Sequence, residues 1–491
     1  MDENNNIPQN QPSNQQPQGE RPANPRPQRE RRTKQEVFKE TQLPLIIMAV
    51  AAVLIVIFII GSITRGIQKK HTERDASIAM SESIAAEESR LNAEMADILT
   101  RADQMAENYD YDGAIALIDS FSGNIGGYPQ LQDAKARYEY SKQALVPWED
   151  PSTILSLIVN PLIADTDRAY YHPEYAGSFK NNFLTTDEFR NLLQRLYESD
   201  YILVNMSDFV EVTVSDSGVS TYKYKELYLP EGKKPVVLTE ANACYSLYLV
   251  DSDDDMIADK GGVGMANKML FDDTGKVITE LVNADGSVST GAYDVVPILD
   301  AFVEEHPDFS YRGAKAVLAL TGYNGVFGYR THPDGRVTLG EEEYEKNVET
   351  VKTLAAALTD SGYELACYTY ANSSYGAFSV SQIQSDIAKW TDEVVPIIGK
   401  TEILVFAQNS DIGSGMLYSG EKYDYLKAAG FNYFISPIVD GNPFTFISDE
   451  YVRQGRLFVS RATIKAQENW FSSIMDTEGI IDDEIRNTSA D

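Results

Sequence analysis

The sequence predicts an α/β domain built largely from parallel strands, preceded by a membrane-spanning helix and an α-helical stalk. Short apolar runs such as Val236–Leu238, within KKPVVLTEANACYSLY, lack polar alternation, which is typical of strands covered on both faces. Such runs alternate with amphipathic helical patterns from about residue 150 onward. The uninterrupted apolar sequence from Leu45 to Ile60 indicates the membrane helix.

Composition narrows the classes of function. The chain has 491 residues, of which 43% are hydrophobic, enough for one large domain with accessory segments. Its net charge is −32; residues 1–70 hold 10 Lys/Arg and 6 Asp/Glu, which leaves 32 against 68, or −36, in the remainder. Such an acidic surface repels nucleic acid, so we expect no nucleic-acid partner. The two cysteines, Cys244 and Cys367, are too few for a disulfide framework.

The N-terminal segment predicts a membrane anchor. Residues 1–43 are rich in Asn, Gln, Pro and Arg, which predicts a disordered tail, and a transmembrane helix is expected over residues 44–63 with Pro44 at its first position. The long polar leader and the lack of a small-residue cleavage site argue against a cleaved signal peptide. Basic residues flank the helix, six before it and four after it: Arg26, Arg29, Arg31, Arg32, Lys34 and Lys39, then Arg65, Lys69, Lys70 and Arg74. The positive-inside rule therefore predicts a single-pass cell-membrane protein with a cytoplasmic N-terminus and an extracellular C-terminal domain.

Residues 64–146 predict a helical stalk. Apolar residues recur there every seven positions, at Ile84, Leu91, Ile98 and Met105. This spacing predicts a long helix or a short coiled coil. Two further helices are expected at Tyr111–Phe121 and Leu131–Leu145. The pair resembles one tetratricopeptide-type hairpin, but a plain helical spacer is the favoured alternative because a single unit has no period to check.

Residues 150–486 predict the α/β domain. A capping box, Thr185 with Glu188, begins an amphipathic helix, and a strand follows at Tyr201–Val204. Turn sequences at Asp272–Lys276 and Asn283–Ser287 predict inserted β-hairpins. Further strands are expected at Ala314–Thr321, Glu364–Tyr370, Glu402–Ala407 and Asn432–Val439, with helices at Tyr293–Pro307, Glu343–Thr359 and Val380–Val395.

Three segments resemble motifs of the polysaccharide deacetylase (NodB-homology, carbohydrate esterase family 4-like) family. KKPVVLTEANACYSLY is similar to the family's PVVLTFDDG, with Glu240, Ala241 and Asn242 in place of Phe and the two Asp. ELACYTYANSSYG lies where the family has HTxxH or HSxxH, with Tyr368 and Asn372 at the two His positions. EILVFAQNSDIG resembles the family strand that ends in RxxPYG or YPFG. The resemblance spans residues 156–486.

The resemblance implies a fold, an activity and a cofactor. The fold is an irregular (β/α) barrel of about seven strands, here with inserted hairpins. The family's activity is zinc-dependent removal of N-acetyl groups from cell-wall glycans, with the first Asp as general base and the second as a metal ligand. Ala241, Asn242, Tyr368 and Asn372 replace these residues, so we expect no metal cofactor and a catalytically inactive relative, a pseudoenzyme. The four histidines, His71, His172, His306 and His332, lie outside the motifs, and His332 is the one retained as an outside candidate.

Alternatives to this interpretation concern the site and the partner. A hydrolase with a shifted site would use Glu240 or Asp411 as its base, although alternation along the strand predicts that Glu240 faces the opposite layer. Aromatic residues near the predicted strand ends either stack on sugar rings or fill the core: Tyr245, Tyr368, Tyr370 and Tyr375. Cys244 and Cys367 form one bridge or remain buried thiols. The expected partner is cell-wall glycan or an envelope protein; in a third hypothesis the stalk is the interaction surface.

Overall fold

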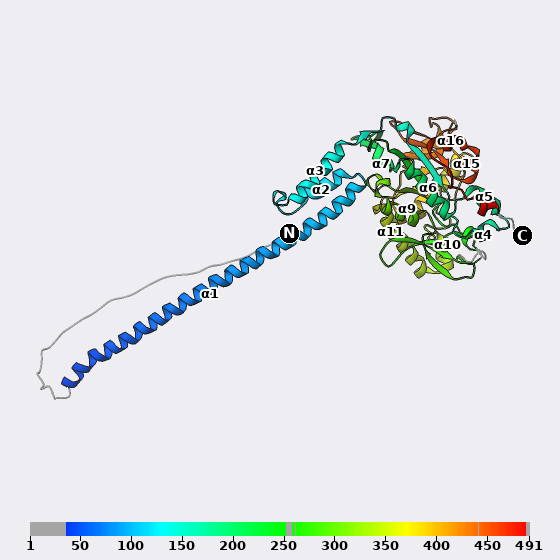
Figure 1. Ribbon diagram of the computed structural model, residues 1–491. Helices are drawn as coiled ribbons and strands as arrows, with labels where there is room; N and C mark the ends of the chain where they lie inside the picture. Colours follow the sequence, from blue (N-terminus) through cyan, green and yellow to red (C-terminus); the bar gives the residue numbers. More distant parts are fainter. Residues whose placement is uncertain (1–35, 252–257, 261, 440, 488–491) are drawn as a thin grey trace, which may run out of the picture. The chain divides into compact units, whose positions relative to one another are not determined.

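The computed structural model describes residues 36–487 except 252–257, 261 and 440 (Figure 1). The chain divides into two compact units, Met1–Ser89 and Arg90–Asp491. Disorder was expected for residues 1–43. Residues 1–35 lie outside the described part of the chain, and residues 36–43 are helical.

Helix α1 (Glu36–Glu107) contains the predicted membrane anchor. Its side chains from Ile47 to Ile60 are apolar and mostly exposed, and this part is long and apolar enough to cross a membrane. The helix begins at Glu36, so the expectation that Pro44 would occupy its first position was wrong. A proline inside a helix removes one backbone hydrogen bond, and here the helix continues through it.

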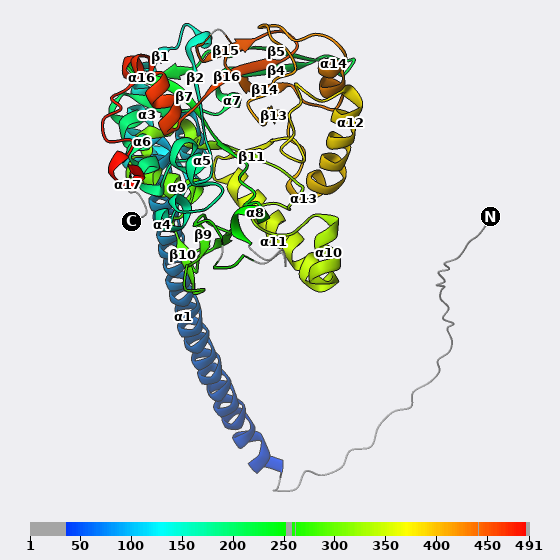
Figure 2. The ribbon, with the colours of Figure 1, turned by 90° about the vertical axis from the view of Figure 1, so that its right-hand side faces the viewer.

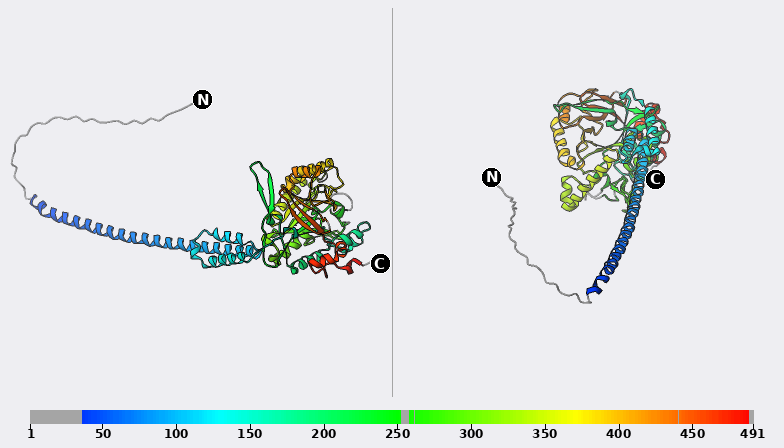
Figure 3. Two further views of the ribbon diagram at one scale, coloured as in Figure 1. Left: turned by 90° about the horizontal axis from the view of Figure 1, so that it is seen from above. Right: turned by 90° about the vertical axis from the view of Figure 1, so that its left-hand side faces the viewer.

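The second unit begins with a three-helix bundle. The end of α1 packs with α2 (Tyr111–Asp119) and α3 (Pro129–Gln143), which lie side by side in Figure 3. Its core consists of Ile98, Ala102, Ala114, Ile118, Phe121, Leu131, Ala134 and Tyr138. Of the seven-residue repeat, Leu91, Ile98 and Met105 face this core. Ile84 is 51% exposed, so the repeat marks a bundle face only from Leu91 onward.

Seven parallel strands close into a barrel (Figure 2). Around the barrel they run β2 (Leu155–Val159), β7 (Lys234–Ala241), β11 (Ala316–Leu320), β12 (Glu364–Cys367), β13 (Ile403–Val405), β14 (Tyr433–Pro437) and β16 (Val452–Phe458), which pairs with β2 again. The predicted α/β barrel is therefore confirmed. Strands β2 and β16 were missing from the sequence prediction.

Side chains alternate between the two faces of the barrel wall. On β7, Val237 and Ala241 join the cluster inside the barrel, whereas Val236 and Leu238 join the cluster between the strands and the surrounding helices. Major helices of that outer layer are α6 (Thr186–Glu198), α9 (Val295–Glu305), α11 (Glu341–Asp360), α12 (Val380–Lys389) and α14 (Glu421–Ala428). Shorter helices are α4 (Thr166–Tyr170), α5 (Ala176–Asn182), α7 (Met206–Phe209), α8 (Leu247–Val250), α10 (Pro333–Leu339), α13 (Val395–Ile398), α15 (Arg461–Ala466), α16 (Glu468–Ile474) and α17 (Asp483–Asn487).

Local sequence signals set the ends of several helices. The Thr185–Glu188 capping box is present at the start of α6, and the Glu188 carboxylate also pairs with the buried Arg486 guanidinium. Gly362 follows α11 with φ of +103°, and a Cβ there would lie 1.9 Å from the Gly313 carbonyl oxygen. Only glycine fits this close approach, which confirms the predicted end of the helix.

The inserted hairpins are also present. Strands β8 (Lys268–Phe271), β9 (Val277–Val282) and β10 (Val288–Gly291) form an antiparallel sheet, with turns at the two predicted positions. Four further strands pair outside the barrel: β4 (Val210–Val214) with β5 (Ser220–Tyr224), and β1 (Val146–Pro147) with β6 (Tyr228–Leu229). Strand β3 (Tyr201–Leu203) extends the sheet beside β7, and β15 (Phe444–Ile447) runs antiparallel to β16.

Candidate functional site

A pocket of about 560 Å³ opens where the barrel strands end. Residues at or just beyond the ends of β2, β7, β12, β13, β14 and β16 line it, together with residues of α5 and α15. The carboxyl ends of parallel strands are the usual place for ligands in α/β barrels, and the volume falls in the range of small-molecule sites. The lining residues are Asn160, Pro161, Ser178, Asn182, Phe183, Asn242, Tyr248, Leu249, Tyr368, Asn372, Gln408, Asn409, Ile438, Arg456, Leu457, Phe458, Ser460, Thr463 and Gln467.

Unusual backbone conformations gather at these strand ends. Asn242 after β7, Thr369 and Asn372 after β12, and Gln408 and Asn409 after β13 all have φ between +48° and +60°. Asparagine tolerates the left-handed region, but a β-branched threonine does so at a real energetic cost. Such strain concentrates at functional sites, because it aims side chains that a relaxed backbone would point elsewhere.

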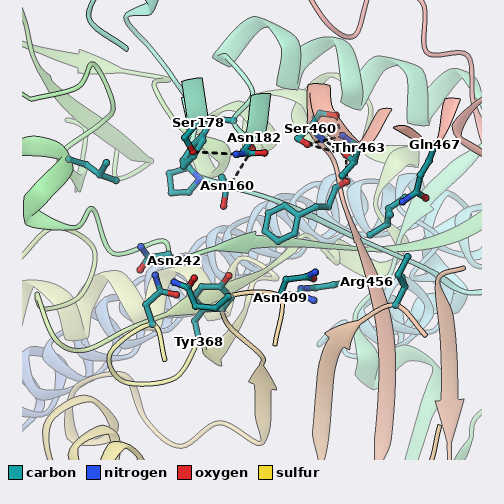
Figure 4. A pocket seen from close by; sticks show the side chains of 18 of the residues that line it. Asn160, Ser178, Asn182, Asn242, Tyr368, Asn409, Arg456, Ser460, Thr463 and Gln467 are labelled. Atoms are coloured by element: carbon teal, nitrogen blue, oxygen red, sulfur yellow. Dashed lines mark hydrogen bonds between the residues drawn. The ribbon is translucent and has the colours of Figure 1, made fainter. Parts of the chain in front are cut away.

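The pocket lining is dominated by carboxamides. Seven Asn and Gln side chains contribute to it: Asn160, Asn182, Asn242, Asn372, Gln408, Asn409 and Gln467. Figure 4 shows Asn242, Tyr368, Asn409 and Arg456 along one wall, and Ser178, Asn182, Asn160, Ser460 and Thr463 along the opposite wall. A carboxamide donates and accepts hydrogen bonds, and so does a sugar hydroxyl. These carboxamides are therefore suited to the hydroxyl groups of a ligand.

Some of these amides are held in fixed orientations. Thr321 Oγ1 donates to Asn242 Oδ1 at 2.9 Å, while Asn242 Nδ2 donates to Ser246 Oγ at 3.1 Å. On the other wall, Asn160 Nδ2 donates to the Asn182 carbonyl oxygen at 3.0 Å, and Asn182 Nδ2 donates to Ser178 Oγ at 3.3 Å. These contacts leave the pocket preorganised before a ligand enters.

The residues at the motif positions do not fit a zinc ion. Zinc sites in proteins use thiolates, imidazoles and carboxylates, whereas the pocket offers the amides of Asn242 and Asn372 and the phenol of Tyr368. Burial raises the pKa of the Tyr368 hydroxyl, although the Arg456 charge opposes this, so the phenol stays protonated at neutral pH. Among the described residues, no cluster of three or more His, Cys, Asp or Glu side chains could hold a metal.

One charged side chain lines the pocket within the described part of the chain. Arg456 comes from the inner face of β16 and is 2% exposed. Its Nη2 donates to the Phe406 carbonyl oxygen at 2.7 Å, its guanidinium carbon lies 5.5 Å from the centre of the Phe458 ring, and the Tyr368 hydroxyl lies beside it. Burial lowers the pKa of this guanidinium, but an arginine remains charged in proteins.

Neither of the two carboxylates proposed as a shifted base lines the pocket. Glu240 is fully buried in the layer outside the barrel, as strand alternation predicted, next to Asp294 at the start of α9. Burial raises the pKa of Glu240, and the charge of Asp294 raises it further; burial also raises the pKa of Asp294, to about 6. Burial and mutual repulsion oppose ionisation of both carboxylates, so we expect at least one of them to stay protonated. Asp411 Oδ2 accepts a hydrogen bond from Arg453 Nη2 at 2.7 Å, in a loop beyond β13.

Of the four tyrosines proposed to bind sugar, Tyr368 is the one among the pocket-lining residues. Tyr245 lies in the outer core beside Asp294, and Tyr375 donates to Asp386 Oδ2 at 2.8 Å from a fully buried position. Tyr370 OH donates to Glu393 Oε2 at 2.5 Å. These three fill the layer around the site.

The remaining candidates also lie in the core. Cys244 and Cys367 are free, buried thiols, and burial raises the pKa of Cys244 to about 11. Cys244 Sγ bonds to both the backbone nitrogen and the carbonyl oxygen of Thr321 at 3.1 Å. His332 is buried at the start of α10, and burial lowers its pKa.

Sequence reasoning missed most of the pocket. Arg456 lies on a strand that was not predicted, and Asn160, Asn182 and Gln467 come from segments without a motif. The available signal was the strand VRQGRLF, where two arginines interrupt a run that joins other buried strands. Charged residues in a buried strand are rare unless they are paired or functional.

No protein-family model and no curated protein matches this chain. Solved structures that resemble it include the Streptococcus pyogenes deacetylase PplD in complex with acetate, with 10% identity and a TM-score of 0.34 over 64% of this chain and 94% of that chain. Another is BC0361, a polysaccharide deacetylase from Bacillus cereus, with 12% identity and a TM-score of 0.32 over 67% of this chain and 69% of that chain.

Proposed function

We propose that this protein is anchored in a cell membrane by α1 and that its barrel domain binds envelope glycan in the strand-end pocket without hydrolysing it. The observation that carries this proposal is the composition of the pocket wall, where the described lining residues include seven carboxamides and Tyr368 but none of the acids and imidazoles that hydrolysis would require. The carboxamides form a set of donors and acceptors that recognises hydroxyl groups but supplies neither a general base nor a metal.

The second part of the proposal is the membrane anchor and its orientation. The exposed apolar part of α1 supports insertion into a bilayer, and the excess of basic residues before it favours a cytoplasmic N-terminus. The acidic remainder of the chain, including the barrel, would then lie outside the cell, where cell-wall glycan is available.

Two measurements on the full chain in nanodiscs test this function. On a microarray of envelope-type oligosaccharides we expect retention of glycan; with N-acetylated chitooligosaccharide we expect no acetate release above background, and elemental analysis should find no stoichiometric zinc. Acetate release by the purified protein would contradict the proposal of a non-hydrolytic module. Absence of binding to any glycan would contradict the proposal of a glycan site.

A variant pair locates the binding. Asn409→Gly removes a pocket amide, and glycine accepts the φ of +48° at this position, so we expect about 5- to 10-fold weaker binding without loss of fold. Asn469→Ala, at an exposed position outside this pocket, is the matched control and should bind as the wild type does. Equal binding by both variants would place the glycan elsewhere.

A further inference from the structure

The guanidinium of Arg456 is a buried cation whose hydrogen-bonding capacity is mostly unused. Its Nε and Nη1 atoms, which carry three of the five N–H donors of a guanidinium, have no acceptor within hydrogen-bond geometry among the described residues, and the Tyr368 hydroxyl interacts with the guanidinium as a neutral hydrogen-bonding group. Burial of a charge is costly unless it is paired and hydrogen-bonded. The Phe406 carbonyl oxygen, at 2.7 Å from Nη2, satisfies only a small part of this requirement.

The pocket contains no acid that would neutralise this charge within the described part of the chain. Its lining residues include no Asp or Glu, and the neighbouring Tyr368 hydroxyl is neutral. Asp411, whose charge acts on Arg456 from outside the pocket, is already paired with Arg453 at 2.7 Å and accepts a second bond from Tyr418 OH at 2.7 Å. An excess positive charge therefore faces the pocket.

We propose that Arg456 is the anion-binding residue of this pocket and that the glycan it takes is an acidic saccharide, presenting one sugar carboxylate to the Arg456 guanidinium. This inference rests on the proposed glycan-binding function and specifies its ligand. A guanidinium donates strong, charge-assisted hydrogen bonds to a carboxylate. The surrounding carboxamides are left for the hydroxyl groups of the same sugar.

Charge balance favours one acidic group over many. The pocket supplies a single cation, so a carboxylate of charge −1 is neutralised, whereas a phosphate monoester would bury up to one further negative charge. At longer range the net charge of −32 repels a polyanion, with the repulsion screened over about 8 Å at physiological salt. The ligand that fits both conditions is a short saccharide, or a chain end, with an isolated acid.

The test compares matched saccharides that differ only at the acid. The full chain in nanodiscs is titrated with cellobiouronic acid and cellobiose, and is applied to an array of oligosaccharides in which each terminal hexuronic acid is paired with the corresponding neutral hexose. We expect the wild type to bind acid members about 10- to 100-fold more tightly than their neutral partners. Arg456→Gln should bind both members equally, and Arg456→Lys should recover part of the preference because it keeps the charge.

Controls separate this inference from the proposed function and from misfolding. Arg336→Gln removes an exposed arginine outside the pocket and should keep the acid preference. The melting temperature of Arg456→Gln should not fall, because the substitution removes an uncompensated charge. Equal binding of acid and neutral members by the wild type would overturn the role of Arg456 and leave the glycan proposal standing, whereas no binding to any member would overturn both.

Discussion

Strand β16 carries one buried arginine on each of its faces, and the two arginines differ in their hydrogen-bond partners. Arg453 and Arg456 lie three positions apart and are both buried, but alternation places them on opposite sides of the barrel wall. On the outer face, Arg453 donates through Nε to Ser436 Oγ at 3.0 Å, through Nη1 to the Met416 carbonyl oxygen at 2.7 Å and through Nη2 to Asp411 at 2.7 Å. On the inner face, Arg456 has one backbone acceptor and two unpartnered nitrogen atoms.

The difference separates a structural arginine from one that is available for a ligand. The Arg453 guanidinium also stacks at 4.2 Å over the Tyr418 ring, so its partners fix the loop after β13 against the barrel. A buried charge whose hydrogen bonds are all made is compatible with a stable fold, whereas a buried charge with unpartnered donors lowers the stability of the fold. Residues that lower stability in this way are retained where they contribute to function.

The largest expected effect concerns the outer face. Arg453→Gln leaves Asp411 without its cationic partner and should lower the free energy of unfolding by about 3–5 kcal/mol. Arg456→Gln, the same substitution on the inner face, should leave the free energy of unfolding within about 1 kcal/mol of wild type or raise it. Urea denaturation followed by circular dichroism measures both. Equal losses in the two variants would show that Arg456 is a structural residue.

An intermediate effect is expected where the two faces of β7 differ. Asn242 borders the pocket, whereas Glu240 shares a buried environment with Asp294 outside the barrel. The pKa of Asp294 is raised from its unfolded value near 3.9 to about 6, and that of Glu240 is also raised. The protonated pair therefore stabilises the fold below about pH 4, and this contribution is lost as pH rises through 6 and above.

Glu240→Gln should remove the part of this pH dependence that belongs to Glu240, because an amide does not titrate, while the burial that raises the pKa of Asp294 remains. Relative to the variant, the wild type should lose on the order of 2 kcal/mol of unfolding free energy between pH 4 and pH 8. Glu345→Gln, at an exposed position on α11, makes the same charge change and should follow the wild-type profile. Parallel profiles for wild type and Glu240→Gln would contradict a raised pKa of Glu240.

The smallest effect distinguishes the core tyrosines from the pocket tyrosine. Tyr375→Phe removes a buried bond to Asp386 Oδ2 and should cost about 1–3 kcal/mol of unfolding free energy. Tyr368→Phe removes a hydroxyl at the pocket and should cost less than about 1 kcal/mol, while weakening binding of acidic saccharide about 3- to 10-fold. The same denaturation and binding assays apply. A larger stability loss for Tyr368→Phe would place its hydroxyl among the structural groups.

Elements with strong local signals were predictable. The capping box of α6, the turns between β8, β9 and β10, and the glycine after α11 each depend on a few neighbouring residues, and all three are present. Strand β16 was missed because its polar residues interrupt the apolar pattern. The residues that pair with them lie far away in the sequence, so no local pattern indicates that they are buried. Alternation placed Glu240 correctly, because side chains along a strand point to opposite faces whatever the surrounding fold.

By itself the sequence determined the apolar segment that is long enough to cross a membrane and the alternation of strands and helices, because these depend on residue type and short-range spacing. The tertiary structure alone decided which side chains meet at the strand ends, since closure of the barrel joins β2 and β16 across about 300 positions of chain. It also decided that Asp411 pairs with Arg453, so that Arg456 has no carboxylate partner and its Nε and Nη1 atoms have no acceptor within hydrogen-bond geometry. Partner choice for a buried charge depends on long-range geometry, which no local pattern encodes.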